Sequence, residues 1–267
     1  MPFFTTNDGV RLWYEDVGRR KPIVFIGGWT MSTAWWQKQI PELSKYCRVI
    51  AIDMRAYGKS DKPAYGHRIT RHAMDLQNAL STLDLHDVTL IGWSMGAATI
   101  LSYLNLFGKE RIVKAILIDQ TPKIVSDEEW KKGVAEDFTA EKALQFVAAI
   151  KANHADFLQD FIPQMFYKER TPAELRWMLR EMLKTPADIA AKLMLDNCVQ
   201  DWRDILPTIK IPIFIIAGKQ SKWMVPGCRY MAKQIPHAKL LLFEQSAHCP
   251  FYEEPEKFNT AVRQFVD

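Results

Sequence analysis

A serine between two glycines, in the segment GWSMG at 92–96, is the part of this sequence with the clearest chemical meaning. The segment lies between a strand-like apolar run, VTLIG at 88–92, and a helix-length segment that begins near Ala97. A sharp turn from a strand into a helix exposes a serine hydroxyl only where small residues two positions before and after it let the chains approach closely. The pattern therefore predicts that Ser94 is a nucleophile rather than a serine in an ordinary turn.

The predicted nucleophile needs a base within hydrogen-bond reach, because an unassisted hydroxyl is a poor nucleophile at pH 7. The chain has six histidines, and His248 lies on a loop after the last strand-like run, KLLLFE at 239–244. We expect His248 to take the proton from Ser94. The other histidines are interpreted as structural or solvated residues: His67, His72, His86, His154 and His237.

The imidazole in turn needs an anion that fixes its tautomer and stabilises the imidazolium form. No carboxylate occurs between Ile205 and Phe243. Asp119 ends the strand-like run VKAILID, and this strand follows the helix after Ser94, so it should neighbour the nucleophile strand. A carboxylate there can approach the histidine loop, and Asp119 is the predicted acid.

Three alternatives for these polar residues remain open. Asp119 could be structural and cap the turn at 120–122. Glu244 is the second candidate acid, although it precedes His248 by only four residues and fits a surface position at a strand end. Ser221 could at most orient the ring through a neutral hydrogen bond.

Two backbone amides are candidates for holding an oxyanion. The amide of Met95 lies at the amino terminus of the helix after Ser94, where the helix dipole favours negative charge. A second amide should come from the loop GGWT at 27–30, whose glycines allow the backbone to approach a ligand closely. Trp29 is the expected donor, and a simple tight turn is the alternative interpretation of this loop.

Strand-like and helix-like segments alternate along most of the chain. A hairpin is predicted first, because PFFTT and VRLWYEDV flank a turn signal at 7–9. The hairpin is followed by near-continuous apolar runs that are separated mostly by helix-length segments. This pattern indicates a mostly parallel sheet covered by helices on both faces, an α/β doubly wound architecture. The runs lie at 23–27, 48–53, 88–92, 113–119, 212–218 and 239–244.

One connection is much longer than the others. About ninety residues separate Asp119 from the run that starts at Pro212, far more than one crossover needs, so an inserted subdomain is expected. Capping patterns predict helix starts within it at Ser126, Thr171 and Thr185. We therefore predict a core formed by 1–121 and 205–267, with a helical cap, or lid, at 122–204.

With these motifs the chain resembles α/β-hydrolase-fold proteins, in the compact capped group of small-molecule esterases, lactonases and cofactor-free haloperoxidases or perhydrolases. The resemblance covers nearly the whole chain and implies an α/β-hydrolase fold with an inserted helical cap. Besides GWSMG, it is carried by IVFIGGW at 23–29, by IAIDMRAYGKSDKP at 50–63, similar to D-x-R-G-x-G-x-S, and by SAHCPFYEEPEKF at 246–258, similar to H-x-P-x-x-E-x-P-x-x-F.

The chain departs from the family pattern at three positions. Gly27 stands where many members have histidine, Ala56 replaces a usual glycine, and Ser221 falls where the acid commonly lies. Some members place the acid after the strand that follows the nucleophile helix, about 25 residues beyond the nucleophile. Asp119 lies 25 residues after Ser94, so the resemblance supports it as the acid.

The activity implied is hydrolysis of a small carboxylic ester or lactone through an acyl-enzyme intermediate, with no metal or organic cofactor. Gly28, Trp93 and Trp223 are predicted to line the substrate pocket, and the helical insertion to form its roof. Because no arginines cluster to bind a phosphate or a carboxylate, we expect an uncharged, moderately apolar acyl group.

Other functions remain open on the same fold. A cofactor-free perhydrolase or haloperoxidase would use the same three residues, with peroxide in place of water. A non-catalytic small-molecule receptor would keep the fold, and a missing acid at the usual position is a change that such a protein could carry. A hydrolase of carbon–carbon bonds is a further alternative.

Composition argues against several other classes of protein. Of the 267 residues, 48% are hydrophobic and 25% charged, and the net charge of +4 is spread without the basic runs of nucleic-acid binders. The first residues resemble no signal peptide, and no segment approaches the roughly eighteen apolar residues of a membrane span. We expect a cytoplasmic protein with no nucleic-acid or membrane partner. The four cysteines share no ligand spacing, so neither a metal site nor a disulfide framework is expected.

Overall fold

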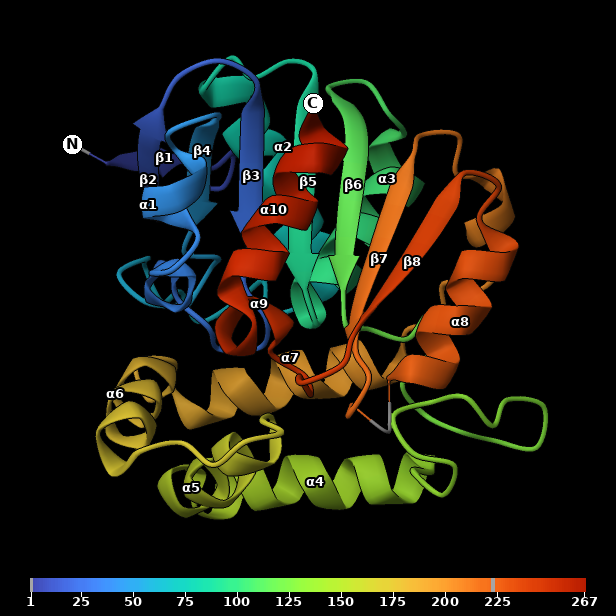
Figure 1. Ribbon diagram of the computed structural model, residues 1–267. Coiled ribbons are helices and arrows are strands. Elements are labelled where there is room, and N and C mark those ends of the chain that lie inside the picture. The colour runs from blue at the N-terminus through green and yellow to red at the C-terminus, as the bar shows by residue number, and fades with distance from the viewer. Residues whose placement is uncertain (1, 222–223) are drawn as a thin grey trace.

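The computed structural model describes residues 2–221 and 224–267 (Figure 1). Within these residues, one sheet has the strand order β1-β2-β4-β3-β5-β6-β7-β8. β2 pairs antiparallel with β1 and β4, and the other neighbours are parallel. The strands are β1 (Phe3–Thr5), β2 (Arg11–Gly18), β3 (Pro22–Ile26), β4 (Arg48–Ile52), β5 (Val88–Trp93), β6 (Ile112–Ile118), β7 (Ile213–Gly218) and β8 (Ala238–Phe243).

Helices cover both faces of the sheet: α10 lies on one face, and α2 and α3 lie on the other (Figure 1). The predicted hairpin and the predicted α/β doubly wound architecture are therefore confirmed. No helix of the described residues is long and apolar enough to cross a membrane. The α-helices are α1 (Ile40–Leu43), α2 (Ile69–Thr82), α3 (Met95–Phe107), α4 (Ala140–Ala152), α5 (His154–Gln164), α6 (Pro172–Met182), α7 (Ala187–Val199), α8 (Val225–Gln234), α9 (Pro250–Glu253) and α10 (Pro255–Val266).

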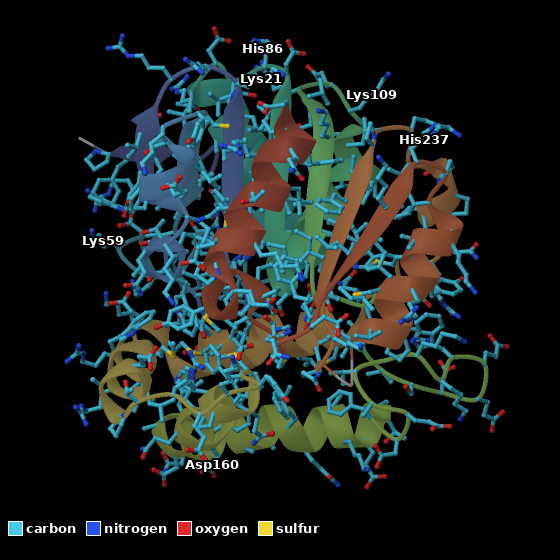
Figure 2. The ribbon with its side chains drawn as sticks, in the orientation of Figure 1. Lys21, Lys59, His86, Lys109, Asp160 and His237 are labelled. Carbon is cyan, nitrogen blue, oxygen red and sulfur yellow. The ribbon has the colours of Figure 1, made fainter. Side chains whose placement is uncertain are left out.

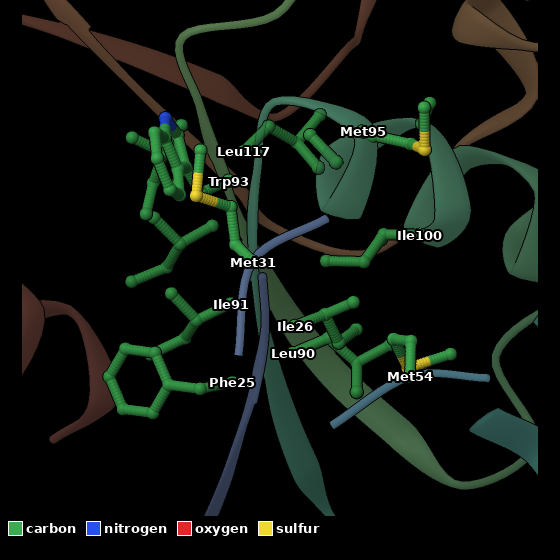
Figure 3. Packing of buried hydrophobic residues seen from close by; sticks show 14 of the residues in the cluster. Phe25, Ile26, Met31, Met54, Leu90, Ile91, Trp93, Met95, Ile100 and Leu117 are labelled. Atoms are coloured by element: carbon green, nitrogen blue, oxygen red, sulfur yellow. The ribbon is translucent and has the colours of Figure 1, made fainter. Parts of the chain in front are cut away.

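The central strands β3, β5 and β6 are buried on both faces, which explains their near-continuous apolar sequences. In the middle of the core, Phe25 of β3 lies beside Ile91 of β5 and Ile26 lies beside Leu90, while Leu117 comes from β6 on the other side of β5 (Figure 3). All five side chains are fully buried. Because these strands are parallel, their carboxyl ends meet at one edge of the sheet. Side chains that follow them are brought together there.

Helices α4 to α7 come between β6 and β7 and lie across this edge of the sheet (Figure 1). The helix start predicted at Thr171 is confirmed, since Thr171 and Glu174 form a capping box at the start of α6. The division of the chain into a core and a cap at 122–204 stays a prediction.

Two other predicted helix starts within this segment are wrong in detail. Ser126 lies in a loop, where its hydroxyl donates to the carbonyl of Ala135 at 2.7 Å. Thr185 comes two residues before α7 but donates to the carbonyl of Ala56 at 3.1 Å instead of capping the helix. Each hydroxyl donates to a carbonyl outside its capping pattern, nine residues away for Ser126 and 129 residues away for Thr185.

The helical segment is fastened to the elements beneath it. Asp196 of α7 accepts a hydrogen bond from the amide of Ile69 at 2.7 Å, at the amino terminus of α2. The residue preceding that helix, Arg68, provides no side-chain cap, so the carboxylate of Asp196 replaces it. The folding of α7 onto the sheet thus satisfies a backbone donor of a core helix.

Asp53 and Arg55 are buried and make polar contacts within the core. Asp53 accepts hydrogen bonds from the amides of Thr33 at 2.6 Å and Lys59 at 2.7 Å, and so joins two loops. Arg55 forms an ion pair with Asp75 at 2.8 Å, with both side chains fully buried. Removing one partner of such a pair leaves an uncompensated charge, so these residues act as a unit.

The buried His72 links stability to pH. Its ring packs edge-on against Tyr57, and burial lowers its pKa from 6.5 to about 3. Between pH 6.5 and about 3, this histidine is protonated in the unfolded chain and neutral in the folded protein. The free energy of unfolding therefore falls as the pH drops through this range. For one proton the slope approaches about 1.4 kcal/mol per pH unit.

The variant His72→Phe keeps an aromatic ring against Tyr57 and removes the titration. We expect urea unfolding between about pH 6.5 and 4.5 to show a shallower fall of the unfolding free energy in this variant than in the wild type, by up to about 1.4 kcal/mol per pH unit. His86→Phe is the matched control, because it makes the same replacement at an exposed position. Equal slopes for wild type and His72→Phe would contradict the assignment.

Candidate active site

Ser94 occupies a sharp turn between β5, which ends at Trp93, and α3, which begins at Met95. Its backbone has φ 53° and ψ −120°, a conformation that residues other than glycine rarely adopt. A Cβ on Gly92 would lie 2.5 Å from the carbonyl carbon of Gly96, and one on Gly96 would lie 2.3 Å from the carbonyl oxygen of Ile26. Only glycines fit at these two positions, which explains the G-x-S-x-G spacing physically.

The two candidate oxyanion donors come from segments that flank this turn. Met95 is the first residue of α3, where a backbone amide has no partner within the helix. The loop after β3 lies against the serine, because a Cβ on Gly28 would be 3.3 Å from Ser94 Cβ. In the described part of the chain, neither the Met95 amide nor the Trp29 amide donates a hydrogen bond to another residue. Both are free to bind an oxygen of a ligand.

His248 is brought to the same edge of the sheet by the loop after β8. The indole Nε1 of Trp93 donates to the carbonyl of His248 at 2.8 Å, which ties the histidine to the residue next to Ser94. His248 Nδ1 lies 2.7 Å from Asp119 Oδ2. Among the described residues, no hydrogen bond joins the Ser94 hydroxyl to the ring; such bonds are often long before a substrate binds.

Asp119 follows the last residue of β6 and is fully buried. Its Oδ1 accepts from the Gly218 amide at 3.2 Å, and its Oδ2 accepts from the Ser221 hydroxyl at 2.6 Å. The turn at 120–122 is satisfied differently, since the Thr121 amide donates to the side chain of Gln120 at 2.9 Å. The structural alternative, in which Asp119 caps that turn, is therefore not what the contacts support.

The second candidate acid points elsewhere. Glu244 is 57% exposed and forms an ion pair with Lys219 at 2.6 Å. Its carboxylate makes no contact with His248 among the described interactions. Of the two candidates, only Asp119 contacts the histidine.

Cys249 follows His248 directly and carries a thiol, which is a potential nucleophile. Its side chain is fully buried, and burial raises the pKa of the thiol well above its usual value of 9.0. The thiolate is the reactive form of cysteine, so this residue is inert at neutral pH. Ser94 remains the candidate nucleophile.

The predicted pocket residues lie in different surroundings. Gly28 contacts the serine turn, as described above. Trp93, in contrast, is fully buried and packs against Trp35 and Phe251, so its indole supports the histidine loop instead of lining open space. The prediction that Trp93 lines the substrate pocket is therefore wrong, because Trp93 is the last residue of β5, a strand that is covered on both faces. Trp223 lies outside the described residues.

The other histidines lie apart from the Asp119 contact. Figure 2 shows His86 and His237 at the end of the molecule opposite α4 and α5, where both are exposed. His154 begins α5 and lies beside the ring of Trp29, with centroids 6.3 Å apart. Trp29 also donates from Nε1 to the carbonyl of Ala190 at 2.8 Å, which connects the candidate oxyanion loop to α7.

Sequence reasoning missed one residue that holds the histidine loop, Glu253. Its Oε2 accepts from the amide of Ala247 at 2.8 Å, and its Oε1 accepts from the amides of Tyr167 at 2.9 Å and Lys168 at 3.2 Å. Burial raises the pKa of this carboxyl. The H-x-P-x-x-E spacing at 248–253 marks Glu253 in the sequence. No local rule, however, predicts that its carboxylate contacts both the histidine loop and the loop at 167–168.

Comparison with known proteins identifies the family of this chain. The family described as alpha/beta hydrolase fold matches residues 21–255, and the chain belongs to this family. It is 29% identical to the AB hydrolase superfamily protein YisY of Bacillus subtilis over 98% of both chains, and 32% identical to a non-heme haloperoxidase of Rhodococcus erythropolis over the whole of both. An esterase from Exiguobacterium antarcticum superposes with a TM-score of 0.94 at 28% identity, covering 99% of this chain and 98% of that one.

These similarities confirm the predicted α/β-hydrolase fold and the resemblance to the esterase and haloperoxidase group. They also establish the coarse class of the protein, a hydrolase. The roles of individual residues stay predictions, and the geometry described above is what supports them.

The three hydrogen bonds that Glu253 accepts from the amides of Ala247, Tyr167 and Lys168 are tested by Glu253→Gln. Glutamine keeps the shape of the side chain but turns one acceptor into a donor. One of the three amides then faces an NH2 group, so we expect a loss of about 1–3 kcal/mol in unfolding free energy, measured by urea titration. Glu256→Gln, on the exposed face of α10, is the control and should change stability by less than about 0.5 kcal/mol. If the two variants had the same unfolding free energy, Glu253 would not hold the histidine loop in place.

Proposed function

We propose that this protein is a serine hydrolase that cleaves a small, uncharged carboxylic ester or lactone through an acyl-enzyme intermediate. The proposal is carried by the 2.7 Å contact between His248 Nδ1 and the buried carboxylate of Asp119, on a loop tied to the residue before Ser94. A histidine oriented by an acid, beside a serine on a strained turn, has the roles that acyl transfer needs.

In the first step, Ser94 Oγ attacks the acyl carbon and His248 Nε2 takes the hydroxyl proton. An Nδ1–H that donates to Asp119 leaves Nε2 as the acceptor, so this contact selects the tautomer that the step requires. Negative charge develops on the carbonyl oxygen, where the amides of Trp29 and Met95 stabilise it. The imidazolium then gives its proton to the leaving alcohol, and water, activated by the same histidine, releases the acid.

The charge balance around Asp119 favours this sequence of proton transfers. Among the described residues, its carboxylate forms no ion pair with a lysine or an arginine, and it accepts only from a backbone amide, a hydroxyl and the imidazole. Within this described part of the chain, a full positive charge appears beside it only when His248 is protonated. The interaction is therefore stronger in the transition state than in the ground state, which is the condition for catalysis.

A second candidate function, perhydrolysis, is favoured by the similarity to a non-heme haloperoxidase at 32% identity. Hydrogen peroxide would replace water in attacking the acyl-enzyme, release a peracid and leave the serine free. The peracid would then oxidise a halide ion in solution. The same residues serve both reactions, and helices α4 to α7 would roof the substrate in either case.

The proposal is tested with a fluorophosphonate probe and with p-nitrophenyl acetate and butyrate. We expect a single probe adduct by intact mass in the wild type and none in Ser94→Ala, which also loses turnover. Asp119→Asn should lower kcat by roughly 10³- to 10⁴-fold, because the histidine loses the anion that fixes its tautomer. Peracid formed from acetate and hydrogen peroxide, and lost in Ser94→Ala, would identify the perhydrolase.

Glu244→Gln is the matched control, since it also removes a carboxylate near the histidine in sequence but from an exposed ion pair. Its kcat should stay within about twofold of the wild type. A fall of less than about tenfold in Asp119→Asn would contradict the acid assignment. A wild type that gave neither adduct nor turnover would favour a non-catalytic receptor.

A further inference from the structure

We propose that Glu181 of α6 is a positioning residue for the candidate oxyanion donor, the backbone amide of Trp29. The inference rests on the proposed function, in which that amide binds the oxyanion. The candidate oxyanion loop continues to Ser32, which precedes the short helix η1 (Thr33–Trp36). Ser32 Oγ donates to Glu181 Oε2 at 2.6 Å. Because Ser32 is only 3% exposed, water is a poor substitute for this acceptor.

Helix α6 is oriented so that Glu181 faces this loop. The ring of Trp177 in α6 packs against that of Trp35 in η1, with centroids 5.2 Å apart. Residues four apart lie on the same face of a helix, so Glu181 comes next to the residue that precedes η1, Ser32. Lys184 Nζ lies 2.5 Å from Glu181 Oε1, which leaves Oε2 for the hydroxyl. The carboxylate therefore has a defined orientation.

A second hydrogen bond joins the same loop to the helical segment. The indole Nε1 of Trp29 donates to the carbonyl of Ala190 in α7 at 2.8 Å. The residues that make the two bonds flank Thr30, whose φ of 61° is strained. A strained residue keeps its conformation only where its surroundings determine it. The bonds made by positions 29 and 32 are part of those surroundings, because they hold the loop on both sides of the strained residue.

The alignment of the Trp29 amide with the reacting carbonyl depends on the conformation of this loop. The loop already lies against the nucleophile, since a Cβ on Gly28 would be 3.3 Å from Ser94 Cβ. A hydrogen bond weakens steeply as its angle departs from linearity. When Ser32 loses its acceptor, Thr30 can relax and the Trp29 amide turns away from the oxyanion. The loss affects the transition state, in which the oxyanion forms, more than substrate binding.

Glu181 acts through its hydrogen bond and not through its charge. A negative charge close to a developing oxyanion would oppose catalysis, and Lys184 offsets that charge through an ion pair. The two roles respond differently to glutamine, which keeps an oxygen that accepts from Ser32 but removes the charge. Methionine has a similar size and no strong acceptor. A positioning role therefore predicts different outcomes for glutamine and methionine at this position.

The positioning role is tested with the near-isosteric pair Glu181→Met and Glu181→Gln. We expect kcat for p-nitrophenyl butyrate to fall on the order of tenfold in the methionine variant, with KM within about twofold, because an oxyanion donor loses part of its alignment. The glutamine variant should recover most of that loss. Equal impairment of both variants, or a change in KM alone, would overturn the role.

Ser32→Ala removes the other partner of the same hydrogen bond. We expect it to lower kcat about as much as Glu181→Met does, and Ser32→Ala/Glu181→Met to be no worse than either single variant. Glu141→Met makes the same replacement at an exposed position of α4, and its kcat should stay within about twofold of the wild type. Thermal unfolding of every variant establishes that it is folded. Additive losses in a folded double variant would contradict a role through this bond.

A pair of ketone inhibitors reports on the oxyanion itself. Ser94 Oγ bonds to the carbonyl carbon of a trifluoromethyl ketone, the carbonyl electron pair moves to the oxygen, and His248 takes the hydroxyl proton. The methyl ketone of the same chain length binds without this addition. We expect the Ki of the trifluoromethyl ketone to rise on the order of tenfold in Glu181→Met and that of the methyl ketone to stay within about twofold. A parallel rise of both would indicate general damage and overturn the role.

Hydrogen exchange separates this inference from the proposed function, because it needs no turnover. The indole Nε1–H of Trp29, assigned by NMR with Trp29→Phe, should exchange faster in Glu181→Met than in the wild type and in Glu181→Gln, because the loop has lost a hydrogen bond to α6. If exchange behaves in this way in a protein that hydrolyses no ester, the proposed function fails and the hold of α6 on the loop stands. If the wild type hydrolyses ester and Glu181→Met changes neither exchange nor kcat, the positioning role fails.

Discussion

A carboxylate that is buried without a cation has to be stabilised by aligned donors, because the transfer of a bare charge out of water is too costly to remain uncompensated. Asp119 is in this position, since its exposure is 0% and the described residues place no lysine or arginine against it. Its donors come from the end of β7, from the turn before α8 and from the loop after β8. Two segments that are distant from Asp119 in the sequence, 218–221 and the loop that holds His248, are therefore arranged around one side chain, and the geometry of the site depends on both.

Much of this arrangement is predictable, because it depends on parallel strands that are buried on both faces. Their apolar runs locate β3, β5 and β6 in the sequence, and the carboxyl ends of such strands share one edge. Since β6 pairs with β5, Asp119 has to come near Ser94 once both strands are recognised. Family resemblance adds the spacing of 25 residues between them. The departure at Ser221 is also informative, because it removes the carboxylate from the position after β7 where the family commonly has its acid.

The residues that sequence reasoning misjudged make contacts that lie outside their own sequence motifs. Ser126 carries a capping pattern, but its hydroxyl has a carbonyl of a nearby loop as its acceptor. Trp93 is next to the candidate nucleophile, yet the pleat of β5 directs its indole into the core. Glu253 joins Ala247 to the loop at 167–168, and this joins the histidine loop to the helical segment. No local sequence pattern predicts which of several carboxylates will accept hydrogen bonds from two segments at once.

Backbone strain marks the same edge of the sheet. Ser94, with φ 53°, and Asp119, with φ 47°, both follow buried parallel strands and adopt a conformation that glycine tolerates best. Thr30 of the candidate oxyanion loop, with φ 61°, shares this feature. Each such residue costs on the order of 1–3 kcal/mol and persists only where its surroundings determine it. For Ser94 and Asp119 these surroundings are ladder bonds, in which their amides donate to the carbonyls of Ile118 and Ile216 at 2.8 Å in both cases. The strands thus hold the backbone of both residues in the strained conformation, from which the Asp119 carboxylate contacts His248 and the Ser94 side chain lies against Gly28.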